Sequence, residues 1–158
     1  MEGKIPRLIA DVMLGKCAKW LRIMGFNVLY RNDYSDREII ALLKSQPDLN
    51  LLTRDTRLHR QLEIKSRVFL VRSNDFREQV MEVTKKFGLP ELSERLSRCI
   101  RCNEKIVEVP KINVRGRVPP YVFDTQERFF YCPTCDRIYW PGTHVTRAGE
   151  ELDKLTSD

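Results

Sequence analysis

Short apolar runs alternate with segments of helical apolar periodicity over residues 8 to 88. Four of these runs are short enough to be strands and are bounded by polar or turn residues: Leu8–Ala10, Asn27–Tyr30, Asn50–Thr53 and Val68–Val71. After each run, apolar residues recur every three or four positions, which is typical of an amphipathic helix. Strands that alternate with helices predict an α/β fold, with a mostly parallel sheet flanked by helices.

Helix start and stop signals support this division. Ser35 and Glu38 have the spacing of a capping box, so a helix is predicted to begin after Ser35. The first helix is expected to end near Gly25, and the last near Gly88 and Pro90. These boundaries leave short loops between the predicted strands and helices.

The pattern changes near residue 98. Three short β-type runs follow, separated by proline, glycine and charged residues: Ile106–Val109, Phe129–Tyr131 and Ile138–Trp140. We therefore predict an α/β domain over residues 1–97, a small β module over 98–148, and an acidic tail over 149–158 that is expected to fray.

Four cysteines in two Cys-x-x-Cys arms define the β module: Cys99, Cys102, Cys132 and Cys135. Two such arms wrap four thiolates round a tetrahedral Zn²⁺, and a site without an open position is structural. A fifth cysteine, Cys17, stands alone, which favours reduced thiols over a disulfide framework. Asn103 and Asp136 follow the second cysteine of each arm, where the turn favours a residue that tolerates positive φ.

Acidic residues follow the predicted strands. Asp11 and Asp55 come after the first and third strands, and Asp36 opens the second helix. Parallel strands present their carboxyl ends at one edge, so the three carboxylates are expected to converge there and hold Mg²⁺ or Mn²⁺. Helix capping alone would also explain Asp36 and Asp55. Asp33 competes with Asp36, and Asp75 is a doubtful fourth member.

The positive net charge of the chain suits a polyanionic partner. The net charge is +6, and residues 1–98 hold 19 Lys and Arg against 13 Asp and Glu, which accounts for the whole excess. Lys16, Lys19 and Arg22 share an arc of the first helix, as phosphate contacts or as a solvated face. No apolar run is long enough for a membrane helix and no secretory signal is evident, so a soluble, cytoplasmic protein is expected.

The β module also interleaves basic and aromatic residues, which suits RNA bases and phosphates. Its aromatic residues are equally suited to a small core or to a seam with the first domain. His144 is a candidate RNA contact.

Four blocks of sequence, in order, resemble the Mut-seven C-terminal RNase family. They are Asp11–Arg22, Leu52–Asp55, Arg98–Asn103 and Tyr139–His144, and the resemblance runs from Arg7 to His144. That family joins a PIN-like nuclease fold to a C-terminal zinc ribbon. The resemblance implies a ribonuclease that cleaves single-stranded RNA at a Mg²⁺ or Mn²⁺ site.

The same resemblance implies roles for individual residues. The carboxylates of Asp11, Asp36 and Asp55 would be catalytic metal ligands. Thr53 would help to orient the site, and the expected nucleic-acid contacts are Lys16, Lys19, Arg22, Thr53 and Arg54.

Two other functions stay open at this point. In a non-catalytic RNA-binding or ribosome-associated protein, the acids would only cap helices. In a receiver-like domain, Asp11 and Asp55 would end the first and third strands. Such a domain also needs a fifth strand followed by a lysine, and here the cysteine-rich part begins before a fifth strand is apparent. The RNA substrate, endo or exo cleavage, self-association and a protein inhibitor are also left open.

Overall fold

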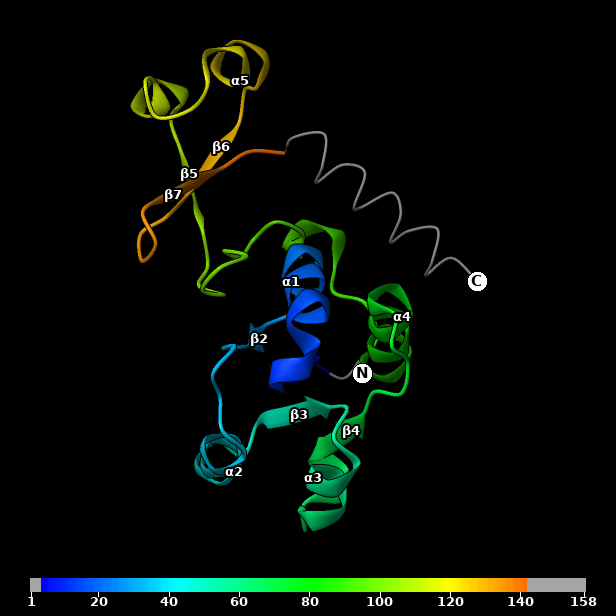
Figure 1. Ribbon diagram of the computed structural model, residues 1–158. Coiled ribbons are helices and arrows are strands. Elements are labelled where there is room, and N and C mark those ends of the chain that lie inside the picture. Colours follow the sequence, from blue (N-terminus) through cyan, green and yellow to red (C-terminus); the bar gives the residue numbers. More distant parts are fainter. Residues whose placement is uncertain (1–3, 142–158) are drawn as a thin grey trace.

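The computed structural model describes residues 4–141 and contains a four-stranded parallel sheet (Figure 1). Its strands are β1 (Arg7–Ala10), β2 (Val28–Leu29), β3 (Leu49–Thr53) and β4 (Val68–Leu70), in the order β2-β1-β3-β4. The sheet with its flanking helices and the small C-terminal sheet confirm the predicted fold class.

Helices cover both faces of this sheet. On one face α1 (Gly15–Met24) and α4 (Phe76–Phe87) pack on a core that includes Leu8, Ala10 and Leu52. On the other face α2 (Asp36–Ser45) and α3 (Thr56–Gln61) pack on Ile9 and its neighbours. Alternate residues of β1 therefore point into opposite cores, as the pleat of a strand requires.

Three single-turn 3₁₀ segments join these elements: η1 (Val12–Leu14), η2 (Lys65–Arg67) and η3 (Leu92–Glu94). The predicted capping box at Ser35 and Glu38 is present at the start of α2. No helix within residues 4–141 is long and apolar enough to cross a membrane.

The register of β1 and β3 places the end of one strand beside the end of the other. Ala10 pairs with Leu52, and the Asp11 amide donates to the Leu52 carbonyl at 3.0 Å. The chain leaves β1 through α1 on one face and reaches β3 through α2 on the other, so the connections diverge between these two strands. Ligands of open α/β sheets bind at such a switch point, beyond the carboxyl ends of the strands.

Gly25 ends α1 in the left-handed region, with φ of +105°. A Cβ atom at this residue would lie 2.7 Å from the Glu94 carbonyl oxygen, and the Leu96 amide donates to the Ile23 carbonyl at 3.1 Å. The segment that leads to the C-terminal part of the chain thus passes directly over the C-terminal end of α1.

The C-terminal part forms a three-stranded antiparallel sheet of β5 (Val107–Val109), β6 (Phe129–Cys132) and β7 (Arg137–Tyr139). Between β5 and β6 the chain forms η4 (Lys111–Val114) and the short helix α5 (Pro120–Thr125), which the sequence pattern did not predict. Val114 of η4, Val122 of α5 and Val118 between them are buried and pack on Phe129. Pro120 starts α5 at the first helical position, where the missing N–H costs nothing.

Candidate zinc site and active site

The four cysteines of the C-terminal part gather into one cluster. The Sγ atoms of Cys99, Cys102, Cys132 and Cys135 all lie within 4.8 Å of one another, and those of Cys102 and Cys132 are 3.5 Å apart. A tetrahedral zinc with Zn–S bonds near 2.3 Å requires S–S separations of about 3.8 Å. The donor set and its spacing therefore suit one zinc ion, with no ligand position left for water.

The backbone of both arms has the shape that a zinc knuckle needs. Asn103 has φ of +72° and Asp136 has φ of +52°, which confirms the prediction of left-handed turns at these residues. The Asn103 amide donates to the Cys99 carbonyl at 2.8 Å, and the Cys135 amide points at Cys132 Sγ at 3.4 Å. Local hydrogen bonds thus hold the sulfur atoms together.

Tyr139 lies next to the first cysteine, with its hydroxyl 2.9 Å from Cys99 Sγ. Burial opposes ionisation of Cys99, yet the hydrogen bond with Tyr139 and those with the backbone of Cys102 and Arg101 lower its pKa to about 7. Burial raises the pKa of Cys102 to about 12. A bound zinc ion would hold all four sulfurs as thiolates.

The first knuckle also docks onto the edge of the parallel sheet. Asn103 is buried, and its Oδ1 accepts from the Val28 amide at 3.1 Å while its Nδ2 donates to Asn27 Oδ1 at 2.7 Å. Arg22 Nε donates to the Val28 carbonyl at 2.9 Å, and its Nη1 donates to the carbonyls of Ile100 and Arg101. Asn103 and Arg22 thus provide hydrogen-bond partners for the amide and the carbonyl of Val28 in edge strand β2.

This docking corrects the expected place of Arg22. The residue was predicted on an arc with Lys16 and Lys19, but only 4% of its surface is exposed. Lys16 and Lys19 are exposed, as an RNA contact requires. The guanidinium of Arg22 is engaged by carbonyl groups from β2 and from the knuckle, so it is not available to a phosphate.

Asp11 is the most buried of the candidate carboxylates. It is 4% exposed and accepts three hydrogen bonds, from the amides of Met13 and Arg54 at 2.9 Å each and from Thr53 Oγ1 at 2.5 Å. The side chain therefore caps η1 and is also tied to the end of β3. Its carboxylate lies at the switch point between β1 and β3.

Thr53 connects Asp11 with the second candidate acid. Its hydroxyl donates to Asp11 Oδ2 and accepts from the Asp55 amide at 3.0 Å. Asp55 is half-buried and caps α3, because its Oδ1 accepts from the amides of Arg57 and Leu58. The two acids are thus neighbours through one buried threonine.

The remaining acids follow the outer strands of the sheet. Asp36 is the exposed first residue of α2, after β2, and Asp33 forms an exposed ion pair with Arg31 at 3.0 Å. Asp75 caps α4, after β4, through the amides of Arg77 and Glu78. Each of the four parallel strands is therefore followed by at least one carboxylate at the same edge.

These carboxylates are not gathered as closely as the cysteines. Within residues 4–141, the four cysteines are the only group of three or more potential metal ligands whose ligand atoms come together. Asp11 and Asp55 instead direct their oxygens to backbone amides. Their donor chemistry fits a hard divalent cation.

Arg54 comes directly before Asp55 in the chain and contacts Asp11. Its amide donates to Asp11, and its guanidinium donates to Asn74 Oδ1 and to the Arg72 carbonyl. The Nε atom is buried and has no hydrogen-bond partner in the described part of the chain. Arg54 thus links the turns after β3 and β4.

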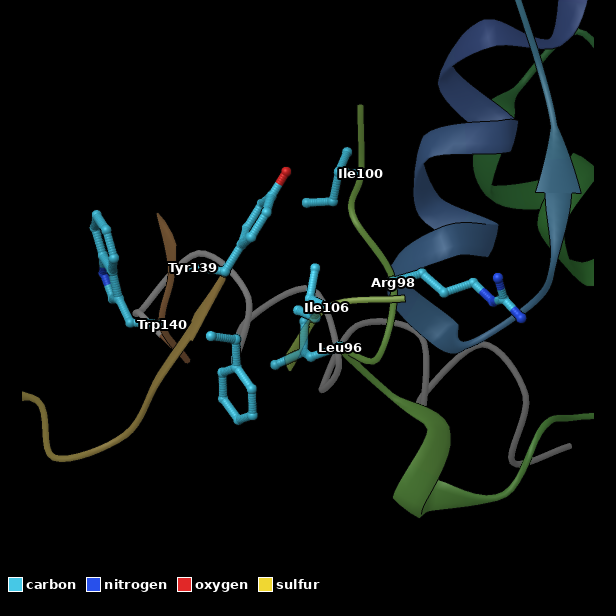
Figure 2. Close-up of a pocket in the computed structure, with 7 residues that line it drawn as sticks. Leu96, Arg98, Ile100, Ile106, Tyr139 and Trp140 are labelled. Atoms are coloured by element: carbon cyan, nitrogen blue, oxygen red, sulfur yellow. The ribbon is translucent and has the colours of Figure 1, made fainter. Parts of the chain in front are cut away.

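Some of the aromatic residues of the C-terminal part form a small core, namely Phe123, Phe129 and Trp140. Phe129 is fully buried, and Trp140 packs against it with ring centroids 6.4 Å apart. Tyr139 and Ile100 border a small, mostly apolar pocket at the junction with the preceding segment, and the Arg98 guanidinium points away from it (Figure 2). Neither this pocket nor a larger neighbouring one is lined by Asp11, Asp36 or Asp55.

Cys17 and His144 are the remaining candidate residues of the sequence. Cys17 is fully buried, and burial raises the pKa of its thiol to about 12, so it is an inert core residue. His144 lies outside the described residues.

The fold and the two sites define an α/β protein with carboxylates along one sheet edge and a four-cysteine site that suits zinc. A family model described as the Mut7-C RNAse domain matches residues 6–152, nearly the whole chain. The chain therefore belongs to the Mut7-C RNAse domain family, which implies a ribonuclease and an RNA substrate. No curated protein and no solved structure matched it.

Proposed function

We propose that this protein is a metal-dependent ribonuclease that hydrolyses phosphodiester bonds in single-stranded RNA. The observation that carries the proposal is the Asp11–Thr53–Asp55 arrangement at the switch point of the sheet, in a chain of an RNase family. A switch point is where an α/β sheet receives its ligand, and carboxylates suit the cations used in phosphate chemistry.

In this proposal Asp11, Asp36 and Asp55 hold one or two Mg²⁺ or Mn²⁺ ions. When bound, such ions supply an activated water and stabilise charge on the phosphate oxygens. Asp11 is the central ligand because it is buried and already oriented by three hydrogen bonds. Asp36 is chosen over Asp33 because it stands at the start of α2.

The surrounding residues prepare this edge for a polyanion. Thr53 fixes the Asp11 carboxylate, and the Arg54 amide donates to it while the Arg54 guanidinium lies on the turn after β4. Lys16 and Lys19 are exposed on α1, so they are free to meet phosphates near the acids. The zinc ribbon is structural in this proposal, because four thiolates leave no position for water or substrate.

The test is cleavage of a fluorescently labelled single-stranded RNA by the purified full chain. Cleavage is expected with Mg²⁺ or Mn²⁺ and not without them. Asp55→Asn is the sharpest variant, because an asparagine still caps α3 while the charge is lost. We expect it to lower the cleavage rate by at least about 10²-fold, the scale for loss of one electrostatic stabiliser, with unchanged thermal stability.

A matched pair tests the identity of the outer acid. Asp36→Asn should lower cleavage strongly, whereas Asp33→Asn should leave it within about twofold, because Asp33 belongs only to an exposed ion pair of small energetic value. Equal effects of the two substitutions would remove the assignment of Asp36.

A second candidate is an RNA-binding protein without catalytic activity. The engagement of Asp55 and Asp75 in helix caps favours this reading, because capping accounts for the hydrogen bonds that their carboxylates accept. Binding of labelled RNA with no product under Mg²⁺ or Mn²⁺, after prolonged incubation, would establish it over the ribonuclease.

A further inference from the structure

A tyrosine at the end of the edge strand β2 reaches the turn that follows β1. Tyr30 comes directly after Leu29, and its ring packs on the core beneath α1 and α4. Its hydroxyl donates to the Val12 carbonyl at 3.2 Å. Val12 belongs to η1, the turn between Asp11 and α1. A side chain from the end of β2 is therefore bonded to the backbone next to the central candidate acid.

Gly15, the first residue of α1, leaves room for this hydroxyl. Its φ of −59° and ψ of −47° are ordinary helical values, so the backbone does not require a glycine there. A Cβ atom at Gly15 would lie 2.5 Å from Tyr30 Oη and 3.0 Å from Tyr30 Cζ. Alanine forms helices better than glycine, so it is the approach of the tyrosine that explains the glycine at this residue.

The turn that Tyr30 contacts has little apolar anchorage of its own. Of its three residues only Leu14 is buried, whereas Val12 is 41% and Met13 is 59% exposed. Its shape depends on hydrogen bonds instead, because the Leu14 amide donates to the Asp11 carbonyl at 3.0 Å and the Met13 amide donates to Asp11 Oδ1 at 2.9 Å. A displacement of η1 therefore also displaces a donor that orients the Asp11 carboxylate.

Asp11 is thus held from the two strands that flank β1. On the β3 side, Thr53 Oγ1 and the Arg54 amide donate to its Oδ2. On the β2 side, the Tyr30 hydroxyl holds η1, which donates to its Oδ1. We propose that Tyr30, accommodated by Gly15, is a positioning residue that fixes η1 and, through it, the direction of the Asp11 carboxylate for binding a divalent cation. This inference rests on the proposed function, because it takes Asp11 to be a metal ligand.

Three variants of the zinc-loaded full chain test the role of Tyr30. Tyr30→Phe removes only the hydroxyl. Gly15→Ala introduces a Cβ atom into the space that the hydroxyl occupies. Tyr34→Phe is the matched control, because Tyr34 is a half-buried tyrosine of the same loop whose hydroxyl makes no hydrogen bond within residues 4–141.

The first measurement is hydrogen exchange at the Met13 amide, followed by nuclear magnetic resonance without RNA, Mg²⁺ or Mn²⁺. We expect exchange about fivefold faster in Tyr30→Phe, the factor for loss of one neutral hydrogen bond. Gly15→Ala should have a similar effect and the double variant no larger one, because both substitutions remove the same hydrogen bond. Tyr34→Phe should match the parent. Unchanged exchange in Tyr30→Phe, or additive effects in the double variant, would overturn the inference.

The second measurement is Mn²⁺ affinity, by isothermal titration calorimetry. Loss of a group that orients a metal ligand costs about 10–100-fold in affinity or activity, and we expect Tyr30→Phe to raise the Kd for Mn²⁺ about tenfold, because Tyr30 acts through η1. Cleavage by this variant should need correspondingly more Mn²⁺, with an unchanged KM for RNA. Unchanged Mn²⁺ affinity would overturn the inference, and a raised KM for RNA in its place would make Tyr30 a substrate contact.

Exchange at Met13 is measured without Mn²⁺ and RNA, so the inference and the proposed function fail in different ways. Cleavage by the parent, with Met13 exchange and Mn²⁺ affinity that do not change in Tyr30→Phe, would refute the inference and leave the ribonuclease intact. A parent that neither binds Mn²⁺ nor cleaves RNA would refute the ribonuclease, and exchange that still depends on Tyr30 would leave its hold on the η1 turn in place.

Discussion

At the scale of single residues, Thr53 connects two acids of the candidate active site. Its hydroxyl is fully buried, donates to the Asp11 carboxylate and accepts from the Asp55 amide. One side chain therefore fixes the position of two candidate metal ligands that are 44 positions apart in the chain. A group that orients ligands in this way normally influences activity as strongly as a ligand does.

Thr53→Val keeps the shape of the residue and removes its hydroxyl. We expect a loss of about 1–3 kcal/mol in unfolding free energy, because the Asp55 amide and Asp11 Oδ2 each lose a partner. Cleavage should fall by about 10–100-fold. Urea unfolding and a cleavage assay measure the two effects, and Thr53→Ser, which retains the hydroxyl, should restore most of both. A valine variant as active as the parent would show that Thr53 orients nothing that matters.

Asn103 and Asp136 occupy equivalent positions in the two knuckles, but only Asn103 reaches the parallel sheet. Glycine accepts positive φ, so Asn103→Gly and Asp136→Gly both preserve the turn. We expect Asn103→Gly to cost about 1–3 kcal/mol, because it leaves the buried Val28 amide without a partner. Asp136→Gly loses only exposed contacts with Arg117 and Tyr131, so its cost should stay below about 1 kcal/mol.

Hydrogen exchange at the Val28 amide is the measurement that separates these two variants. Exchange should accelerate in Asn103→Gly alone, while both variants bind one equivalent of zinc. Slow exchange at Val28 in Asn103→Gly would mean that the knuckle does not close the sheet edge.

At the scale of elements, the sequence pattern predicted most of the parallel-sheet part. All four strands and their helices lie where periodicity placed them, and β2 is shorter than predicted because only Val28 and Leu29 pair with β1. Local signals suffice here, since α2, α3 and α4 each begin at a side-chain cap. The short helix α5 was missed because prolines punctuate its start and it has only six residues, too few to show a period.

The candidate site was predictable in its placement and not in its detail. Strand order brings Asp11 and Asp55 to one edge, which follows from short apolar runs ending in acids. The direction of each carboxylate depends on which backbone amides lie within reach, and the sequence does not give that. Arg22 is the clearest case, because the carbonyls that bury it belong to residues 78 and 79 positions away.

The C-terminal end of α1 offers a test of how closely the linking segment approaches the helix. Gly25 and Gly116 both have positive φ, but an added Cβ would collide with the Glu94 backbone only at Gly25 and would meet nothing within 4 Å at Gly116. Gly116→Ala should therefore cost about 1 kcal/mol for backbone strain alone. Gly25→Ala should lower the melting temperature distinctly further, measured by circular dichroism. Equal shifts would mean that the Glu94 segment yields without cost.

At the scale of the whole molecule, the zinc ribbon and the acid edge lie at opposite ends of α1. Near the C-terminal end of α1 (Figure 1), Arg22 donates to the Ile100 carbonyl and the Ile23 carbonyl accepts from the Leu96 amide. Asp11 lies before the N-terminal end of the same helix. Ten residues of helix separate the two ends by about 15 Å. A zinc ion at the four cysteines would therefore influence the candidate acids only indirectly, through the sheet and the helix.

Zinc removal tests the proposed division between residues 1–97 and the ribbon. We expect a chelator to expose the ribbon to trypsin first, because a small module has little core without its metal, and to accelerate exchange at β2 as Asn103 withdraws. Peptide mapping by mass spectrometry follows both events, and added zinc should reverse them. Simultaneous loss of protection in α3, far from the knuckle, would instead indicate a single cooperative unit.

The docking of Asn103 on Val28 has a consequence for the order of assembly during translation. Val28 is made 75 residues before the side chain that satisfies its amide. A nascent chain folds from its N-terminus, so the open rim of β2 waits, unpaired, until the first knuckle has emerged from the ribosome. An unpaired rim is a template for association with other chains. A shortage of zinc would prolong that interval, so yield in bacterial expression should depend on metal supply as well as on temperature.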